Sequence, residues 1–155
     1  MLARRGRLIA HVPELEVGDA CRRRLWLHPE VSKWALAKGE DRKQQRYFEG
    51  VRDFLRNFVI GEDFDNEALL KPLKTSLGAW YEFRILFAPH HRIIGGFLRT
   101  GEFLALTHGT RQDLDKNFAP SIRRANEIWK SLSLDAQPLT GERVDLLEDF
   151  HYDEA

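Results

Sequence analysis

The chain has 155 residues, of which 43% are hydrophobic and 31% are charged, and its formal net charge at pH 7 is zero. This length and composition predict a single globular domain with its own hydrophobic core and exclude a disordered chain. Cys21 is the only cysteine, which excludes an internal disulfide and a cysteine-based zinc cluster and favours a reducing, intracellular compartment.

The N-terminus begins with basic residues, as a signal peptide does, but its apolar stretch is interrupted within a few residues by His11, Pro13 and Glu14. No later run approaches the roughly 20 apolar residues that a membrane span requires. We therefore expect a cytoplasmic protein without a membrane partner. Residues 1–21 show no sustained period and are interpreted as an N-terminal extension, with a short strand at residues 7–12.

Charge is distributed unevenly along the chain. From Leu134 onward there are seven acidic residues against Arg143 alone, a net charge of −6, so residues 1–133 carry +6. A basic body with an acidic tail is typical of proteins that bind a polyanion, and such a tail can screen or mimic the target. A solvated terminal tail is the simpler interpretation of residues 134–155.

Two helices are predicted at the start of the main domain, which we assign to residues 22–133. A short strand at residues 21–28 is followed by Pro29, which starts a helix that ends at Gly39. From residue 40 to residue 60 apolar residues recur at helical spacing and predict a long amphipathic helix. Its outer face is moderately basic, with Arg42, Lys43, Arg46, Arg52 and Arg56 mixed with Glu49 and Asp53. Such faces are usually solvated, although an RNA groove or a partner can use one.

Three antiparallel strands are predicted after residues 61–78, a turn-rich segment in which Pro72 prevents a regular helix. The first strand covers residues 80–87, where apolar residues alternate with charged ones, so that Arg84 points away from the main core. A hairpin of residues 92–108 follows.

Glycines and histidines mark the irregular points of these strands. Gly95 and Gly96 in mid-strand predict a bulge or a close approach of another backbone. Pro89, His90 and His91 are interpreted as turn residues. The two adjacent histidines form a weak set of metal ligands, since no cysteine or paired carboxylate lies near them in the sequence.

A last helix is predicted from Pro120 to Leu132, with Ile122, Ala125 and Ile128 on its apolar face. Together these elements predict an α+β fold, in which a twisted antiparallel sheet packs against two N-terminal helices, with helices covering one sheet face and a C-terminal helix closing the domain.

Five short motifs follow one another from residue 71 to residue 125. They are Lys71 with Lys74, Glu82 to Arg84, Arg92 to Phe97, Leu104 to Gly109, and Ile122 with Ala125. In this order they resemble the RelE/HigB-like toxins of bacterial type II toxin–antitoxin systems, especially the phage-derived branch of the RelE/ParE superfamily. The likeness covers residues 24–132 and implies a small RelE-like fold.

The resemblance implies a toxin that cleaves mRNA on the ribosome and is neutralised by an antitoxin protein. In this reaction the ribose 2′-hydroxyl attacks the adjacent phosphate, without a metal ion or a small-molecule cofactor. The reaction needs a base for the 2′ proton, cations that hold the developing negative charge, and an acid for the leaving 5′ oxygen.

Four residues are the candidate catalytic groups of such a site. Arg84 and Arg92 are assigned as phosphate clamps, because guanidinium groups match phosphate geometry bidentately. His108 is the best general acid or base by its ordinary pKa. Lys71 is placed to contact the scissile phosphate. The simpler alternatives are a surface salt bridge for each arginine, a strand-end support for His108, and a solvated loop position for Lys71.

Further RNA contacts are expected from Lys74, Arg111 and Lys116, and from Trp80 as a base-stacking platform beside the charged face. The family usually has a phenylalanine and paired lysines after its His-Gly motif. This chain has Thr110, Arg111, Gln112 and Asp113 there, and Arg111 and Lys116 are the substitutes we consider.

Two alternative functions follow from these departures. Gln112 and Asp113 in place of the lysines, together with the net charge of zero, favour a non-catalytic inhibitor or interaction module on the same fold, for example one directed at DNA gyrase. In the other alternative, the acidic tail from residue 134 occupies the basic groove of its own chain.

Overall fold

A six-stranded sheet in the order β1-β2-β6-β5-β4-β3 organises the chain in the computed structural model, which describes residues 7–150 apart from positions 63, 65 and 67. The strands are β1 (Ile9–Ala10), β2 (Arg24–Leu27), β3 (Leu70–Pro72), β4 (Tyr81–Ile85), β5 (His91–Arg99) and β6 (Glu102–Thr110). The helices are α1 (Pro29–Ala35), α2 (Arg42–Ile60), α3 (Arg111–Lys116), α4 (Ala119–Ser131) and α5 (Arg143–Leu146). Within the described ranges every helix is too short or too polar to cross a membrane.

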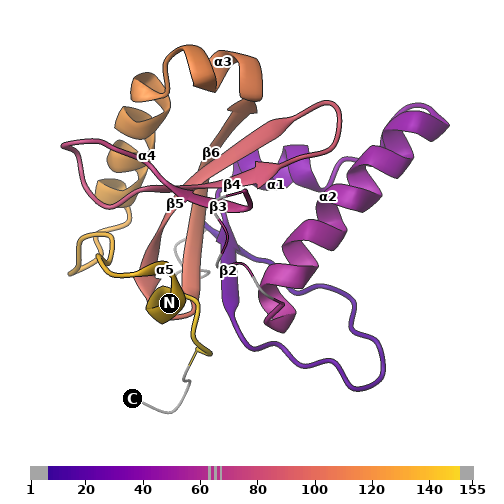
Figure 1. Cartoon of the computed structure of the whole chain (residues 1–155), viewed down its shortest axis with the longest axis horizontal. Coiled ribbons are helices and arrows are strands. Elements are labelled where there is room, and N and C mark those ends of the chain that lie inside the picture. The colour runs from indigo at the N-terminus through magenta and orange to yellow at the C-terminus, as the bar shows by residue number, and fades with distance from the viewer. Residues whose placement is uncertain (1–6, 63, 65, 67, 151–155) are drawn as a thin grey trace.

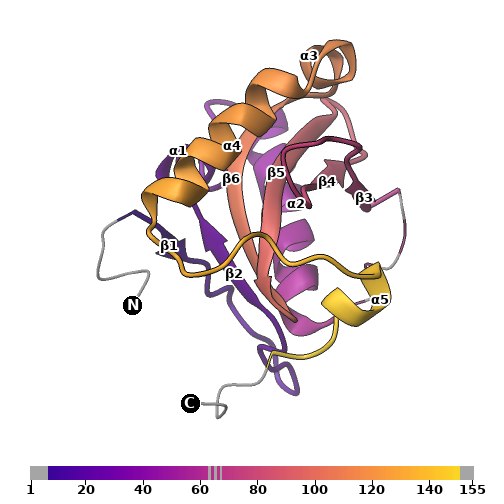
Figure 2. The same cartoon turned by 90° about the vertical axis from the view of Figure 1, so that its left-hand side faces the viewer.

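The sheet is mixed, and helices cover both of its faces. β2 runs parallel to β6, whereas all other neighbouring strands are antiparallel. Figure 2 shows the sheet between α4 on one face and α2 on the other. The predicted α+β class is therefore confirmed. The three predicted antiparallel strands are β4, β5 and β6, and the expected antiparallel sheet is corrected by the parallel pairing of β2 with β6. The expectation of helices on one face only was wrong, because both sheet faces carry apolar side chains that need cover.

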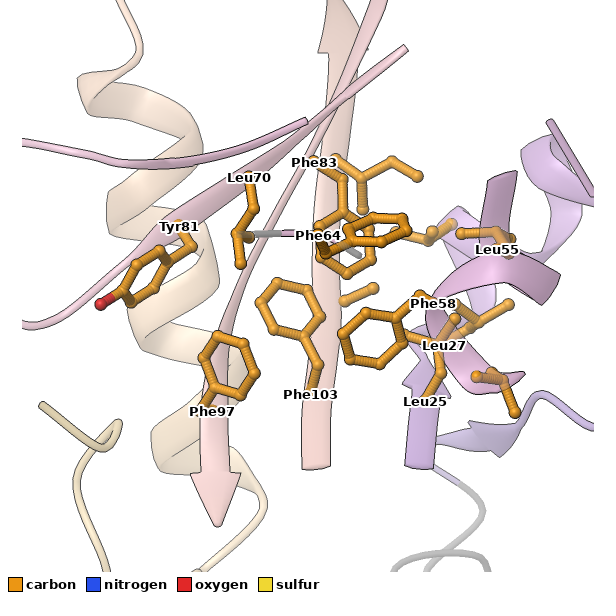
Figure 3. Packing of buried hydrophobic residues seen from close by; sticks show 14 of the residues in the cluster. Leu25, Leu27, Leu55, Phe58, Phe64, Leu70, Tyr81, Phe83, Phe97 and Phe103 are labelled. Carbon is orange, nitrogen blue, oxygen red and sulfur yellow. The ribbon is translucent and has the colours of Figure 1, made fainter. Parts of the chain in front are cut away.

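The main core lies between the sheet and the helices α1 and α2. The apolar stripe of α2 enters it through Val51, Leu55 and Phe58, as its helical spacing predicts. Aromatic rings fill the centre, where Phe83 of β4 and Phe103 of β6 stack with ring centroids 4.3 Å apart (Figure 3). Burial of these large side chains is the main favourable contribution to the fold.

A second core lies on the opposite face, beneath α3 and α4. Ile122 and Trp129 of α4 pack there against Ile94 and Leu104 of the sheet. Trp80 belongs to this core: it is 1% exposed, its ring meets that of Trp129 edge-on, and its indole nitrogen donates a hydrogen bond to the Leu77 carbonyl. The prediction that Trp80 is a base-stacking platform was therefore wrong, because a buried ring offers no face to RNA.

A β-bulge interrupts the pairing of β5 with β6 at the predicted glycine. Ile94 pairs with Thr107 and Gly95 pairs with Ala105, which leaves Leu106 as the additional residue of β6. A Cβ atom on Gly95 would lie 1.9 Å from the Leu104 carbonyl oxygen, so only glycine fits at this position. The bulge shifts the alternation of side chains in the second half of β6 by one residue.

Both terminal segments pack on the domain. Leu8 lies in the second core, and the predicted strand at residues 7–12 is reduced to the two residues of β1. Near the C-terminus, the Gly101 amide donates to the Leu146 carbonyl, and the buried Arg23 side chain donates to the Leu147 carbonyl. Residues 134–150 are thus not the solvated tail of the simpler interpretation, because apolar residues between the acids anchor the segment.

We predict that Gly95→Ala lowers the free energy of unfolding by about 3 kcal/mol or more, since the new methyl group meets a backbone carbonyl that cannot rotate away. Gly109→Ala is the matched control in the neighbouring strand, where a Cβ lies 3.4 Å from the flexible Leu114 side chain. Urea unfolding followed by circular dichroism measures both. Equal losses for the two variants would contradict this account of the bulge.

Candidate functional site

Three charged side chains meet on the sheet face that α3 and α4 cover. Arg84 of β4 and Arg92 of β5 are direct partners in the strand register, and Glu82 shares their face because side chains alternate along β4. The Glu82 Oε1 atom lies 3.4 Å from Arg84 Nε and 3.7 Å from Arg92 Nε. We call Glu82, Arg84 and Arg92 the arginine–glutamate cluster.

The three members of this cluster differ in burial. Glu82 and Arg92 are 5% and 1% exposed, whereas the Arg84 side chain is 24% exposed. Burial raises the pKa of the Glu82 carboxyl, and the positive charges of Arg92 and Arg84 offset only part of that effect. Burial also lowers the pKa of the Arg92 guanidinium, whose ordinary value is far above neutrality. The cluster therefore reaches the surface through Arg84.

Arg92 is therefore buried in the sheet, whereas the sequence predicts a phosphate clamp at this position. Besides the contact with Glu82, its Nη1 atom donates to the His91 carbonyl at 3.2 Å. A guanidinium that is buried in this way holds the carboxylate in position and does not offer a free fork to a phosphate. Arg84 is the arginine of the pair that is placed to meet a ligand.

Lys71 and Arg111 lie near the cluster, and so does the acidic Asp115. Lys71 lies opposite Glu82 in the β3–β4 pairing, and its charge acts on the Glu82 carboxyl. Arg111 begins α3 with a half-exposed side chain that reaches Asp115 and the ring of His90. Lys74 and Lys116 are exposed, on the loop after β3 and at the end of α3.

The segment after the His-Gly motif forms the helix α3. The Thr110 side chain caps this helix by accepting a hydrogen bond from the Asp113 amide at 3.2 Å. An acidic residue in the first turn also suits the positive end of the helix dipole. Asp113 thus contributes to the start of α3 through its backbone amide, which binds the cap, and through its negative charge in the first turn.

His108 lies on the opposite face of the sheet from the arginine–glutamate cluster. Because of the bulge, its side chain points with that of Ile93 towards α1. The sheet therefore separates His108 from Arg84 and Arg92, which contradicts the expectation that these three residues form one site.

A histidine pair, with His91 buried and His108 partly buried, occupies this other face. His91 Nε2 and His108 Nδ1 are 2.9 Å apart, and the His91 ring stacks on Trp34 of α1 with centroids 3.9 Å apart. His91 is the first residue of β5 rather than a turn residue. Burial lowers the pKa of His91 to about 4, helped by the charges of His108 and Arg92, and burial also lowers the pKa of His108.

Sequence reasoning missed two features of these sites. Glu82 is part of the Glu82 to Arg84 motif but has no catalytic role among the sequence-based predictions, although the alternation along the strand places its side chain on the face of Arg84. The contact of His91 with Trp34 has no signal in the sequence, since the two residues are far apart in the chain. Within the described residues, no three His, Cys, Asp or Glu side chains are arranged to hold a metal ion.

We predict that the folded protein loses stability as the pH falls from about 6.5 towards about 4. Both histidines have folded pKa values below the ordinary 6.5, so in this range the unfolded chain binds more protons than the folded one. His91→Phe keeps a ring against Trp34 but cannot be protonated, so its urea midpoint should fall less between neutral and acidic buffers. An equal fall in both proteins would refute this assignment; His11 and His28, whose pKa values are also lowered by burial, contribute the remaining slope.

Comparison with known proteins provides no relative from which a role can be transferred. No model of a known protein family, no curated protein and no solved structure matches the chain. A function is therefore assigned from the chemistry of the side chains that the fold brings together.

Proposed function

We propose that the protein is a toxin-type endoribonuclease that cleaves mRNA on the ribosome at the arginine–glutamate cluster. The observation that carries this proposal is the Glu82 carboxylate between two guanidiniums, with a pKa that burial raises towards neutrality. A carboxylate of raised pKa is a suitable general base, and neighbouring cations stabilise the charge that develops on a phosphate. The order of motifs that resembles the RelE/HigB-like toxins gives additional support.

Each cluster residue has one role in the proposed reaction. Glu82 takes the proton of the ribose 2′-hydroxyl, whose oxygen attacks the adjacent phosphorus and forms a cyclic phosphate. Arg84, the exposed member, binds the phosphate oxygens. Lys71, opposite Glu82, gives a proton to the leaving 5′ oxygen. Arg92 positions Glu82. This scheme uses the residues of the chain alone and gives His108 no catalytic role.

The remaining exposed cations guide the RNA strand to this position. Lys74 and Lys116 are exposed, on the loop after β3 and at the end of α3, and Arg111 is half exposed. They contact the backbone on either side of the scissile phosphate. The proposed partners are mRNA on the ribosome and an antitoxin protein, and the proposed compartment is the cytoplasm, where both occur.

A second candidate function is a non-catalytic inhibitor or interaction module, such as one directed at DNA gyrase. The observation that favours it is the burial of Arg92 and Glu82, since a buried charge pair also serves as a structural link between β4 and β5. In that case the exposed cations alone would contact the target, and the ionisation of Glu82 would not matter to the activity.

We predict that Glu82→Gln and Arg84→Ala each reduce cleavage of translated mRNA by at least about 100-fold and relieve growth arrest on induction. Mapping of mRNA 5′ ends and cleavage on programmed ribosomes measure the effect. Arg99→Ala is the matched control, because this exposed arginine of β5 lies at the hairpin end of the strand, away from the cluster. If the Glu82→Gln variant is as toxic as the original chain and induction of either protein leaves the mRNA 5′ ends unchanged, the nuclease proposal is wrong and the non-catalytic function is the better explanation.

We also predict that the cleavage rate rises with pH through the raised pKa of Glu82 and then levels off. The base must be deprotonated to accept the 2′ proton, and burial moves its pKa upward from the ordinary 4.5. Single-turnover rates on programmed ribosomes give the profile. A rate that is independent of pH on the acidic side would exclude Glu82 as the base.

A further inference from the structure

The first turns of α2 extend beyond the packed part of the molecule. The buried residues of this helix begin only at Val51, and residues 41–46 are all exposed. In Figure 1 this end of α2 projects away from the sheet and from the other helices. The stretch from Arg42 to Arg46 is about 6 Å long at 1.5 Å per residue. Its side chains do not enter the core, which the helix joins only from Tyr47 onward.

Four cations lie in or just before these turns. They are Lys38, Arg42, Lys43 and Arg46, which we call the α2 basic end. All four are exposed, and within the described part of the chain none of their side chains has a hydrogen bond or an ion pair. By contrast, Arg52 of the same helix donates to the Ala37 carbonyl and Arg56 pairs with Asp19. The arginines of the packed half stabilise the fold, and the cations of the projecting half do not.

The position of these cations is unfavourable for the helix itself. Arg42 and Lys43 occupy the first turn of α2, which contains no acidic residue. Basic side chains near the positive end of a helix dipole destabilise the helix. Two capping bonds hold the turn in place: Asp41 accepts from the Gln44 amide and Gln44 accepts from the Glu40 amide, both at 2.8 Å. The basic side chains thus oppose the helix dipole and gain no packing in return. Such a combination is typical of functional positions.

We propose that the α2 basic end is a second nucleic-acid surface, which binds the phosphates of structured RNA. Residues 38–46 contain four cations, two acids and no apolar residue. A protein interface needs an apolar centre, which this surface lacks, whereas phosphate binding needs only correctly placed cations. Arg42 and Arg46 are four residues apart and therefore lie on one side of the helix. The identification of this RNA as ribosomal RNA rests on the proposed function. The proposal that the surface binds RNA does not depend on it.

The surface is separate from the arginine–glutamate cluster. α2 lies on the sheet face opposite α3 and α4, and its basic end belongs to the part of the helix that projects from the sheet (Figures 1 and 2). A ligand of this surface thus need not cover Arg84. A structured RNA held here and a single strand held at the cluster would fix the orientation of the protein on a large RNA target.

The test compares two triple variants of the full chain. Arg42→Gln, Lys43→Gln and Arg46→Gln together remove charge from the α2 basic end, and Arg99→Gln, Arg123→Gln and Lys130→Gln together remove three exposed cations elsewhere. The probe is an RNA duplex of about 16 base pairs, whose binding is measured over a range of salt concentrations. Circular dichroism confirms the fold of both, and the first variant should unfold at no lower temperature than the original chain because it removes the unfavourable dipole interaction.

We expect the first variant to bind the duplex at least about 10-fold more weakly, with the slope of log affinity against log salt reduced by about 2 to 3. The second variant should keep the affinity of the original chain. Equal binding by the first variant and the original chain, or an equal loss in both variants, would overturn the proposal. Glu82→Gln should bind the duplex normally while it loses cleavage, so that failure of the nuclease and failure of this surface are distinguishable.

Discussion

The close contact between Gly95 and the carbonyl of Leu104 determines on which face of the sheet the side chain of His108 in β6 lies. The contact sets the bulge in β6, and the bulge decides which side chains of the strand face each helical layer. Leu104 and Leu106 remain under α4, while His108 is turned towards α1. Without the additional residue, His108 would lie on the same face as Arg92. One backbone contact therefore separates the two groups of ionisable side chains.

The two groups meet the cost of burial in different ways. In the arginine–glutamate cluster, charged groups are brought together so that each desolvated charge has a partner of opposite sign. The histidine pair instead stays neutral, since a hydrogen bond between two neutral rings needs no counter-charge. The first arrangement leaves a carboxylate that can exchange a proton with a ligand reaching Arg84. The second ties α1 to the sheet through the stack of Trp34 on His91.

Local patterns in the sequence predict much of this fold. The stripe of α2, the two-residue alternation along β4 and the bulge at Gly95 all follow from spacing or residue type. Local patterns do not predict which helices cover each face of the sheet. By alternation along the sequence Trp80 shares the face of Glu82 and Arg84, yet that face becomes a core where α4 covers it. Likewise, the acids around Leu146 suggest solvent, whereas its apolar side chain decides the packing. Such outcomes depend on contacts between residues far apart in the chain, which no local period encodes.

The packing of residues 134–150 also brings opposite charges together at one end of the molecule. These residues carry five acids against Arg143. They pack beside three consecutive arginines: the Phe150 amide donates to the Arg22 carbonyl, the Arg23 side chain donates to the Leu147 carbonyl, and the Arg24 guanidinium lies over the Phe150 ring. The charge asymmetry along the sequence is therefore reduced in the folded molecule. A polyanion that approaches it meets local clusters of cations rather than one basic half.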